Sequence, residues 1–370
     1  EKRSDSKYTV VLVGSGCCGL DGKDSDIDLG VARIGEQLPP VDASSRLQSD
    51  FGRGLTALSQ HMTTQPVNME DPSEKETVMR LLRITTSMQN DSLKLKQSLL
   101  RDNVRVPLIT FQANYDHPVE VDVTALSVNS HHNPRLVSAF EAHCPRFIPL
   151  ARVVKLWAKS RGIVDGPKGY LNSWTLVLMV VQYLQLAGLL PVVHTASAEC
   201  PLNNQQQNTV NQSNMYYTTS SGSAYESLPL AKKTELLIKP LEQRQGAVPS
   251  LAELFCGFVA FYAFAFDPAK DVVCVRRGRL VRREQVQHLH KGYADSYVPM
   301  IVEAPFQPSE NTARALKQEN QVKVMREFQR AAKMLADGKS MEDIMKNDVG
   351  WFEWLLIIVI LWIIVSVIKS

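Results

Sequence analysis

Three aspartates have the types and spacing of a metal site. Asp26 and Asp28 flank a single isoleucine, and Asp122 stands in the run VEVDVT. Side chains two residues apart in a strand point to the same face, so Asp26 and Asp28 would present two carboxylates together, and Asp122 can join them from an adjacent strand. Clustered carboxylates repel one another unless a cation neutralises them, and oxygen ligands without His or Cys favour Mg²⁺ or Mn²⁺ over zinc.

Phosphoryl transfer is the chemistry that such a cluster could carry. Two divalent ions can stabilise the attacking and the leaving oxygens of an in-line displacement. The pair Gly14-Ser15, with Ser15 eleven residues before Asp26, could hold phosphate oxygens through its backbone N–H groups. An exposed acidic turn through Asp21, Asp24 and Asp26 is the alternative, and Asp-X-Asp alone does not exclude it. The Gly-Ser pair, the apolar flanks and the third aspartate together favour the metal site.

Strands and a loop must position these groups. Short β-branched runs predict four strands, at residues 8–13, 27–31, 106–112 and 119–124. Residues 14–24 are rich in Gly, Ser and Asp and predict a loop. The candidate phosphate turn would therefore lie in the connection between the first two strands.

The remainder of the chain has mainly helical periodicity. Helices are expected at residues 74–100, 147–160, 173–190, 251–266 and 311–337, with a strand pair at 272–281. Two polar stretches, about residues 36–72 and 200–226, predict an irregular insertion and a disordered one. A strand-rich first third followed by a helical remainder predicts an α+β fold, with a catalytic domain and a mostly helical second domain.

The composition is that of a globular protein with two ordinary domains, since 44% of the 370 residues are apolar. A net charge of +3 is too small to indicate nucleic-acid binding by itself, so any affinity for RNA would come from local patches. The densest basic run, RRGRLVRR at residues 276–283, could hold an RNA backbone or form an exposed hairpin tip, and the sequence favours neither. The six cysteines lack zinc-site spacing, which is typical of free thiols in a reducing compartment.

Residues 351–368 (WFEWLLIIVILWIIVSVI) predict a single transmembrane anchor. They carry one charge, Glu353, and tryptophans suited to the headgroup region. At 1.5 Å per residue they would span roughly 27 Å, enough for a bilayer core. A buried core helix is the alternative, but a helix that is apolar all round needs a large protein around it. Lys333, Lys339 and Lys346 precede the segment and predict a cytoplasmic catalytic part. An anchor of this kind fits the endoplasmic reticulum or the mitochondrial outer membrane equally well.

The order GS, DID and VDV resembles the nucleotidyltransferases related to DNA polymerase β, and more narrowly the noncanonical poly(A) polymerases and terminal uridylyltransferases. Residues 154–162 (VKLWAKSRG), 171–180 (LNSWTLVLMV) and 305–314 (PFQPSENTAR) also follow the family's order. The resemblance covers about residues 8–330 apart from the two insertions. It implies a polymerase β-like nucleotidyltransferase domain with a mixed sheet at residues 8–130 and a helical PAP-associated domain at 131–337. A nucleoside triphosphate would bind between them.

The resemblance also implies roles for individual residues. Asp26 and Asp28 match the metal-binding pair, and Asp122 matches the third carboxylate, which binds metal and activates the RNA 3′-hydroxyl. Ser15, beside Gly14, matches the serine that contacts the triphosphate.

Further matches lie in the second half of the chain. Lys155 and Lys159 match two lysines that contact the triphosphate, and their i, i+4 spacing puts both on one helix face. Without the resemblance such a pair indicates a solvated helix face. Ser173 matches another phosphate contact, and Asn133 matches an asparagine near the ribose hydroxyls. Trp174 stands where the family usually has a tyrosine that stacks on the base; an indole can stack too, the alternative being a core aromatic.

The base-reading segment departs from the family's pattern. The family often has Glu-Asp-Pro-Phe and then a further Asp, whereas Ala304 and Gln307 fill the two Asp positions here. Uridine-adding members often have His where this chain has Glu310, and adenine-adding members often lack a residue there. A carboxylate at Glu310 could accept from uracil N3–H or from the adenine amine. Because the position is filled, the sequence favours uridine slightly and leaves adenine open.

The implied activity is template-independent transfer of UMP or AMP, from UTP or ATP, to an RNA 3′ end. An inactive, membrane-bound RNA-binding scaffold is a second hypothesis, which the loss of any of the three aspartates would favour; all three are present. A transferase acting on a small molecule or a protein is a third. The matches at Lys155, Lys159, Ser173 and Trp174 argue against it.

Overall fold

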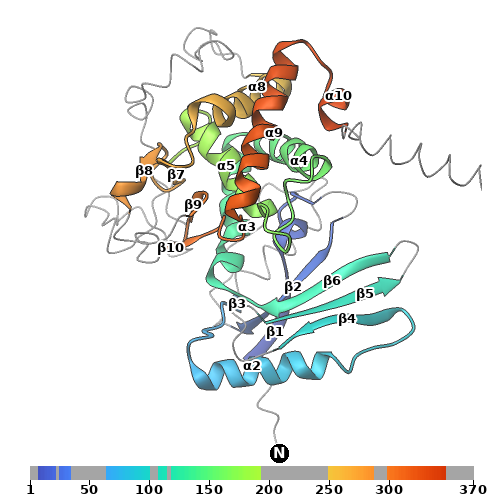
Figure 1. Cartoon of the computed structure of the whole chain (residues 1–370). Coiled ribbons are helices and arrows are strands. Elements are labelled where there is room, and N and C mark those ends of the chain that lie inside the picture. The colour runs from blue at the N-terminus through green and yellow to red at the C-terminus, as the bar shows by residue number, and fades with distance from the viewer. Residues whose placement is uncertain are drawn as a thin grey trace, which may run out of the picture.

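The computed structural model describes residues 7–21, 25–34, 64–100, 107–114, 118–192, 249–286 and 298–346. Figure 1 shows a β-sheet with helix α2 along it, and a group of helices on the other side that carries a second, smaller sheet. The fold is therefore α+β, as the sequence predicts. The predicted insertion at 200–226 and the predicted anchor at 351–368 lie outside the described residues, as does most of the insertion at 36–72. No helix in the described ranges is both long and apolar enough to cross a bilayer.

The first sheet is mixed and has the order β1-β2-β6-β5-β4, with the short β3 on β2. Its strands are β1 (Tyr8–Val13), β2 (Ile27–Ile34), β3 (Thr64–Gln65), β4 (Leu93–Leu99), β5 (Leu108–Asn114) and β6 (Pro118–Ala125). β2 and β6 pair in parallel, and the other pairs are antiparallel. The four predicted strands are confirmed, and β2 runs beyond its predicted end.

Helix α2 (Pro72–Thr85) covers one face of this sheet. It begins where the Asp71 carboxylate accepts hydrogen bonds from two backbone N–H groups, which satisfies donors that a helix start leaves unpaired. Val78 and Leu82 are fully buried and pack in one cluster with Ile109 of β5 and Val123 of β6. This packing leaves the opposite face of the sheet for the aspartates.

The single helix predicted at residues 74–100 is wrong in its second half, where the chain forms β4. Leu93 and Leu95 pack against the α2 cluster while Lys94 and Lys96 between them are exposed. That alternation has the period of a strand. The turn before β4 is closed by Asn90, whose side chain accepts from Leu93 N. Strand pairing with β5 therefore prevails over the helical spacing.

The helical part is built from α3 (Val128–His143), α4 (Phe147–Ser160), α5 (Ser173–Leu186), α8 (Leu251–Ala260), a π-helical turn (Phe261–Ala265), α9 (Gln318–Ala336) and α10 (Met341–Met345). Its core holds a set of aromatic rings in edge-to-face and tilted contact, formed by Trp157, Phe255, Phe258, Tyr262 and Phe328. The predicted helices at 147–160, 173–190 and 251–266 are confirmed, although α5 ends at Leu186.

The second sheet has the order β10-β9-β7-β8 and packs on the helical core. It consists of β7 (Asp271–Val273), β8 (Val281–Arg282), β9 (Ile301–Ala304) and β10 (Gln307–Asn311). The predicted strand pair is β7 and β8, but β9 and β10 were not predicted, and the helix expected at 311–337 starts only at Gln318. Asn311 is held in the sheet because its buried side chain bonds Val302 N and Met300 O.

Three of the five arginines in the arginine-rich run bond to other groups of the protein. Arg276 Nε lies 2.6 Å from Glu303 Oε1, and both side chains are almost fully buried. Arg282 pairs with Asp271, and Arg283 donates to the backbone carbonyl of Val298. The buried Arg276 is therefore not available to a phosphate, whereas Arg279 and Arg282 stay exposed, so both interpretations of the run stay open.

Glu303→Ala is expected to destabilise the protein by about 3–5 kcal/mol, because it leaves the buried Arg276 charge without its partner. The thiol of Cys274, which also donates to Glu303, loses that bond. Denaturant unfolding of the variant measures the loss. Arg279→Ala, on the exposed tip of the same run, is the control and is expected to change stability by about 0.5 kcal/mol or less. Equal effects of the two changes would contradict the prediction.

Candidate active site

The sheet places the three aspartates at neighbouring positions. In the parallel pairing of β2 with β6, Asp28 lies directly opposite Asp122, and on its other side Asp28 pairs with Val13 of β1. Asp26 lies just before β2. Thr110 of β5 donates a 2.6 Å hydrogen bond to Asp122 Oδ1, which holds that carboxylate in place. The strands thus bring together the residues that the sequence singled out.

The donor set fits a hard divalent cation, since it consists of carboxylate oxygens. In the described residues no three such side chains are yet gathered closely enough to hold an ion by themselves. The carboxylates repel one another, since the charges of Asp122 and Asp26 add to burial in raising the pKa of Asp28. A cation would remove that repulsion.

Burial, followed by the charges of Asp122 and Asp26, raises the pKa of Asp28 to about 6. The pKa of Asp26 is also raised, first by burial and then by Glu120 and Asp122, while Lys159 and Lys96 act in the opposite direction. A carboxyl with a raised pKa in a group of like charges is typical of a functional site.

The free energy of unfolding without metal is expected to fall as pH rises from about 4 to about 6. In that window the folded protein keeps a proton on Asp28 that the unfolded chain has lost, so raising the pH favours unfolding. Melting temperatures in chelator across this window measure the effect, and Asp28→Asn should flatten the slope. Mg²⁺ should stabilise the wild type most above pH 6, where the carboxylates are ionised. An unchanged slope in Asp28→Asn would contradict the assignment to this residue.

The turn after β1 approaches Asp28 so closely that it requires glycine. Gly14 has φ +68°, and a Cβ placed on it would lie 1.9 Å from Asp28 Oδ2. The turn continues as a 3₁₀ helix, Gly14–Cys17. Ser15 O accepts from Cys18 N and Leu20 N, and the Cys17 thiol donates to Gly14 O. The Gly-Ser turn is therefore internally hydrogen-bonded and lies directly against the Asp28 carboxylate.

Helix α4 lies against this turn and supplies the two lysines. Lys155 Nζ donates to Leu20 O at 2.5 Å, and burial lowers the pKa of Lys155. Lys159, one turn further on, is exposed, and its positive charge partly offsets the rise in the pKa of Asp26. Arg152 pairs with Asp21 at 3.5 Å. The described contacts thus place one lysine on the turn and the other within electrostatic reach of the carboxylates.

The start of α5 lies beside the end of β10. Asn172 caps the helix by accepting from Thr175 N, and its Nδ2 donates to Thr312 O at 2.7 Å. Ser173 is exposed at the first helical position. Trp174 is half-buried against the helical core, and its buried indole Nε1 has no hydrogen-bond partner among the described residues. Both interpretations of Trp174, base stacking and core packing, stay open.

Helix α3 faces the β9–β10 hairpin through its first two turns. Asn133, the predicted ribose contact, has a buried Oδ1 atom without a partner in the part of the chain that the structure describes. Asn129, four residues earlier, donates from Nδ2 to Glu310 Oε2 and to Gln307 Oε1. Glu310 Oε1 also accepts from Arg314 at 2.6 Å. Asn129 was not predicted from the sequence, although its i, i+4 spacing from Asn133 indicates a shared helix face.

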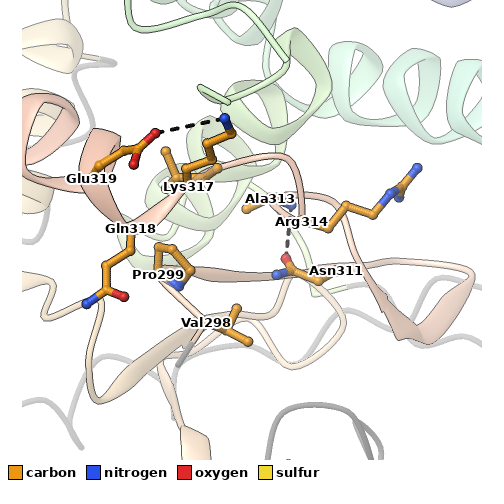
Figure 2. A pocket seen from close by; sticks show the side chains of 9 residues that line it. Val298, Pro299, Asn311, Ala313, Arg314, Lys317, Gln318 and Glu319 are labelled. Atoms are coloured by element: carbon orange, nitrogen blue, oxygen red, sulfur yellow. Dashed lines mark hydrogen bonds and ion pairs between the residues drawn. The ribbon is translucent and has the colours of Figure 1, made fainter. Parts of the chain in front are cut away.

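A hollow of about 460 Å³ lies next to this cluster rather than among the aspartates. Figure 2 shows it at the start of α9, between Val298 and Pro299 on one side and Lys317 and Glu319 on the other. Arg314 lines it and links it to Glu310. The hollow contains none of the predicted phosphate or metal contacts.

Known proteins share both the sequence and the fold. Residues 250–310 match the family described as Cid1 family poly A polymerase. Poly(A) RNA polymerase gld-2 of Caenorhabditis elegans is 28% identical over 232 residues, which is 63% of this chain and 19% of that protein. Terminal uridylyltransferase cid1 of Schizosaccharomyces pombe is 28% identical over 213 residues, or 55% of this chain and 47% of that protein. The chain is thus similar to noncanonical poly(A) polymerases and to terminal uridylyltransferases.

Solved structures of the family have the same fold. A crystal structure of the Cid1 poly(U) polymerase bound to MgATP has a TM-score of 0.58 and 22% identity, covering 94% of this chain and 88% of that one. Cid1 in complex with its short product ApU has a TM-score of 0.56 and 20% identity, covering 93% and 87%. At this identity the structures establish the shared fold. The chain spans 19% to 48% of the length of the first curated poly(A) polymerases that it matches.

Proposed function

We propose that this chain is a template-independent RNA nucleotidyltransferase that adds UMP or AMP from the nucleoside triphosphate to RNA 3′ ends. The main support for the proposal is that Asp28 pairs with Asp122 across β2 and β6, while the backbone of Gly14 lies directly against the Asp28 carboxylate. Family relatives are named poly(A) RNA polymerases and terminal uridylyltransferases, which supports the reaction class.

In the proposed reaction, the RNA 3′-oxygen attacks the α-phosphorus and the bond to pyrophosphate breaks. Asp26, Asp28 and Asp122 would hold Mg²⁺ or Mn²⁺, which neutralises charge on the reacting oxygens when bound. Asp122 would take the proton of the 3′-hydroxyl. Ser15 and the Gly14 turn would contact the triphosphate.

The helical side of the cleft would supply the remaining contacts. Lys155, Lys159 and Ser173 would bind the triphosphate, whose negative charge their ammonium and hydroxyl groups complement. Asn133 would contact the ribose and Trp174 the base. Glu310 would accept a hydrogen bond from the base, either from uracil N3–H or from the adenine amine. Catalysis would consist chiefly of positioning and charge neutralisation.

Extension of a labelled RNA by the full chain in detergent tests this function. Each NTP is supplied separately with Mg²⁺ or with Mn²⁺, and a 3′-deoxy RNA, which lacks the attacking hydroxyl, serves as the control. Extension confined to the RNA with a free 3′-hydroxyl is the expected result. Absence of extension with every NTP, from protein shown to be folded, would favour the RNA-binding scaffold instead.

We also propose that residues 351–368 anchor the protein in a membrane, with the catalytic part on the cytoplasmic side of the endoplasmic reticulum or the mitochondrial outer membrane. The support is the apolar sequence of this segment and the lysines before it. A location inside mitochondria is the alternative. Resistance of the full chain to alkaline extraction from membranes, lost on deletion of 351–368, is the expected result. Alkaline release of the full chain would contradict the anchor.

A further inference from the structure

Two adjacent cysteines lie in the Gly-Ser turn beside the carboxylates. Cys17 ends the 3₁₀ helix and is fully buried, whereas Cys18, directly after it, is partly exposed, and both are free thiols. The two sulfur atoms approach the same backbone oxygen, since Cys17 Sγ lies 3.1 Å and Cys18 Sγ 3.4 Å from Gly14 O. The thiols therefore lie side by side, and solvent reaches one of them.

The two thiols and a nearby lysine affect one another. A hydrogen bond with Cys18, and then burial, raise the pKa of the Cys17 thiol, so Cys17 keeps its proton. Burial lowers the pKa of Lys155 and the charge of Cys18 acts in the opposite direction, which places the ammonium close to this sulfur. A Cys18 thiolate would thus face a cation and a thiol that can donate to it. Partly exposed, electropositive surroundings are typical of reactive cysteines, so Cys18 can react first and Cys17 can follow.

The same thiols hold the turn against the Asp28 carboxylate. Gly14 O accepts from both of them, and a Cβ on Gly14 would lie only 1.9 Å from Asp28 Oδ2, so the turn has no room to shift without moving Asp28. A disulfide between the two cysteines would remove both S–H donors. Adjacent Cα atoms are about 3.8 Å apart, less than the roughly 4.4–6.8 Å that disulfides usually span, so this bond would also distort the turn.

We infer that Cys17 and Cys18 form a reversible oxidation site for peroxides, whose disulfide form displaces the Gly-Ser turn and slows nucleotide transfer. The effect on transfer rests on the proposed function. A disulfide strained by its short span is readily reduced again, which suits a transient, regulatory bond. The turn that faces the triphosphate would then respond to the redox state of its surroundings.

The oxidation proceeds in two steps. The Cys18 thiolate attacks one oxygen of hydrogen peroxide, the O–O bond breaks, and hydroxide leaves and takes up the proton that Cys18 had released. The Cys17 sulfur then attacks the sulfur of the Cys18 sulfenic acid, and its proton leaves with the hydroxyl group as water. Together the thiols lose two electrons and two protons, and the peroxide is reduced to water.

Peroxide treatment of the full chain, followed by mass spectrometry, tests the inference. Trypsin releases both cysteines in one peptide, from Tyr8 to Lys23, which contains no other cysteine. After peroxide this peptide should resist alkylation and lose the mass of two hydrogens, and dithiothreitol should reverse both changes. RNA extension by the same samples should fall roughly a hundredfold, as for a displacement of about 1 Å at reacting groups, and recover with dithiothreitol. A peptide that stays open to alkylation would overturn the inference.

Three variants, each compared with its own reduced form, separate this site from other thiols. Cys18→Ser should keep its extension rate after peroxide, because the attacking thiolate is missing. Cys17→Ser should instead accumulate the Cys18 sulfenic acid, which dimedone labels. Cys256→Ser removes a partly exposed thiol on α8 and should respond as the wild type does. Inactivation of Cys18→Ser as complete as that of the wild type would overturn the inference.

Failure of the proposed function would be seen separately. If the reduced protein extends no RNA with any NTP, the transferase assignment fails, while the mass of the Tyr8–Lys23 peptide still tests the oxidation site. Mg²⁺ should then raise the melting temperature of the reduced protein more than that of the oxidised protein, because oxidation disturbs the surroundings of Asp28. Equal shifts in the two forms would show that the turn stays in place and would overturn the inference.

Discussion

Asp122→Asn is expected to lower RNA extension by roughly a thousandfold or more. The substitution removes one charge from the carboxylate set and the base that would take the proton of the 3′-hydroxyl. A loss of about 4 kcal/mol of transition-state stabilisation corresponds to roughly this factor. Initial rates of extension at saturating NTP and RNA measure it.

The same change should leave the fold intact or slightly more stable. Thr110 Oγ1 can still donate to the Oδ1 atom of an asparagine, so its hydrogen bond persists. Removal of the Asp122 charge also relieves the repulsion that raises the pKa of Asp28 and Asp26. Asp91→Asn, at an exposed carboxylate before β4, is the control and should retain activity. A destabilised Asp122→Asn protein, or one with near-normal extension, would contradict the catalytic role.

Local sequence signals predicted the part of the molecule that holds the carboxylates. The β-branched runs of β1, β2 and β6 are short and continuous, and their register follows from pairing such runs side by side. Asp28 and Asp122 therefore meet as predicted. Strand β4 was missed because leucine and lysine alternate over only a few residues after a true helix, so the two periods overlap at the boundary.

Non-local contacts decided what the sequence could not show. β9 and β10 contain Glu303 and Asn311, which are unusual inside a sheet. Arg276, 27 residues earlier, stabilises Glu303, and backbone groups at the start of β9 stabilise Asn311. The bonds of Asn129 reach residues more than 170 positions away. No local pattern carries that information, so these contacts emerged only from the fold.

Gly14→Ala is expected to lower extension by roughly a hundredfold while Asp122 stays in place. The new Cβ would lie 1.9 Å from Asp28 Oδ2, and L residues rarely adopt φ +68°. Either the turn or the Asp28 side chain must move, and a displacement of about 1 Å at reacting groups costs about that factor. Extension rates and the pH dependence of stability should change together, because both depend on the surroundings of Asp28.

Two neighbouring glycines separate the possible causes of that loss. Gly16 has open space where a Cβ would be added and no positive φ, so Gly16→Ala should be nearly silent. Gly19 has the same φ of +68° as Gly14, but a Cβ added to Gly19 would meet no atom within 4 Å. Gly19→Ala therefore introduces backbone strain without a clash. A large loss in Gly14→Ala with a small one in Gly19→Ala would show that contact with Asp28 is the cause. Equal losses in the two would show that strain in the turn suffices, and the close approach of Gly14 to Asp28 would then have no catalytic importance.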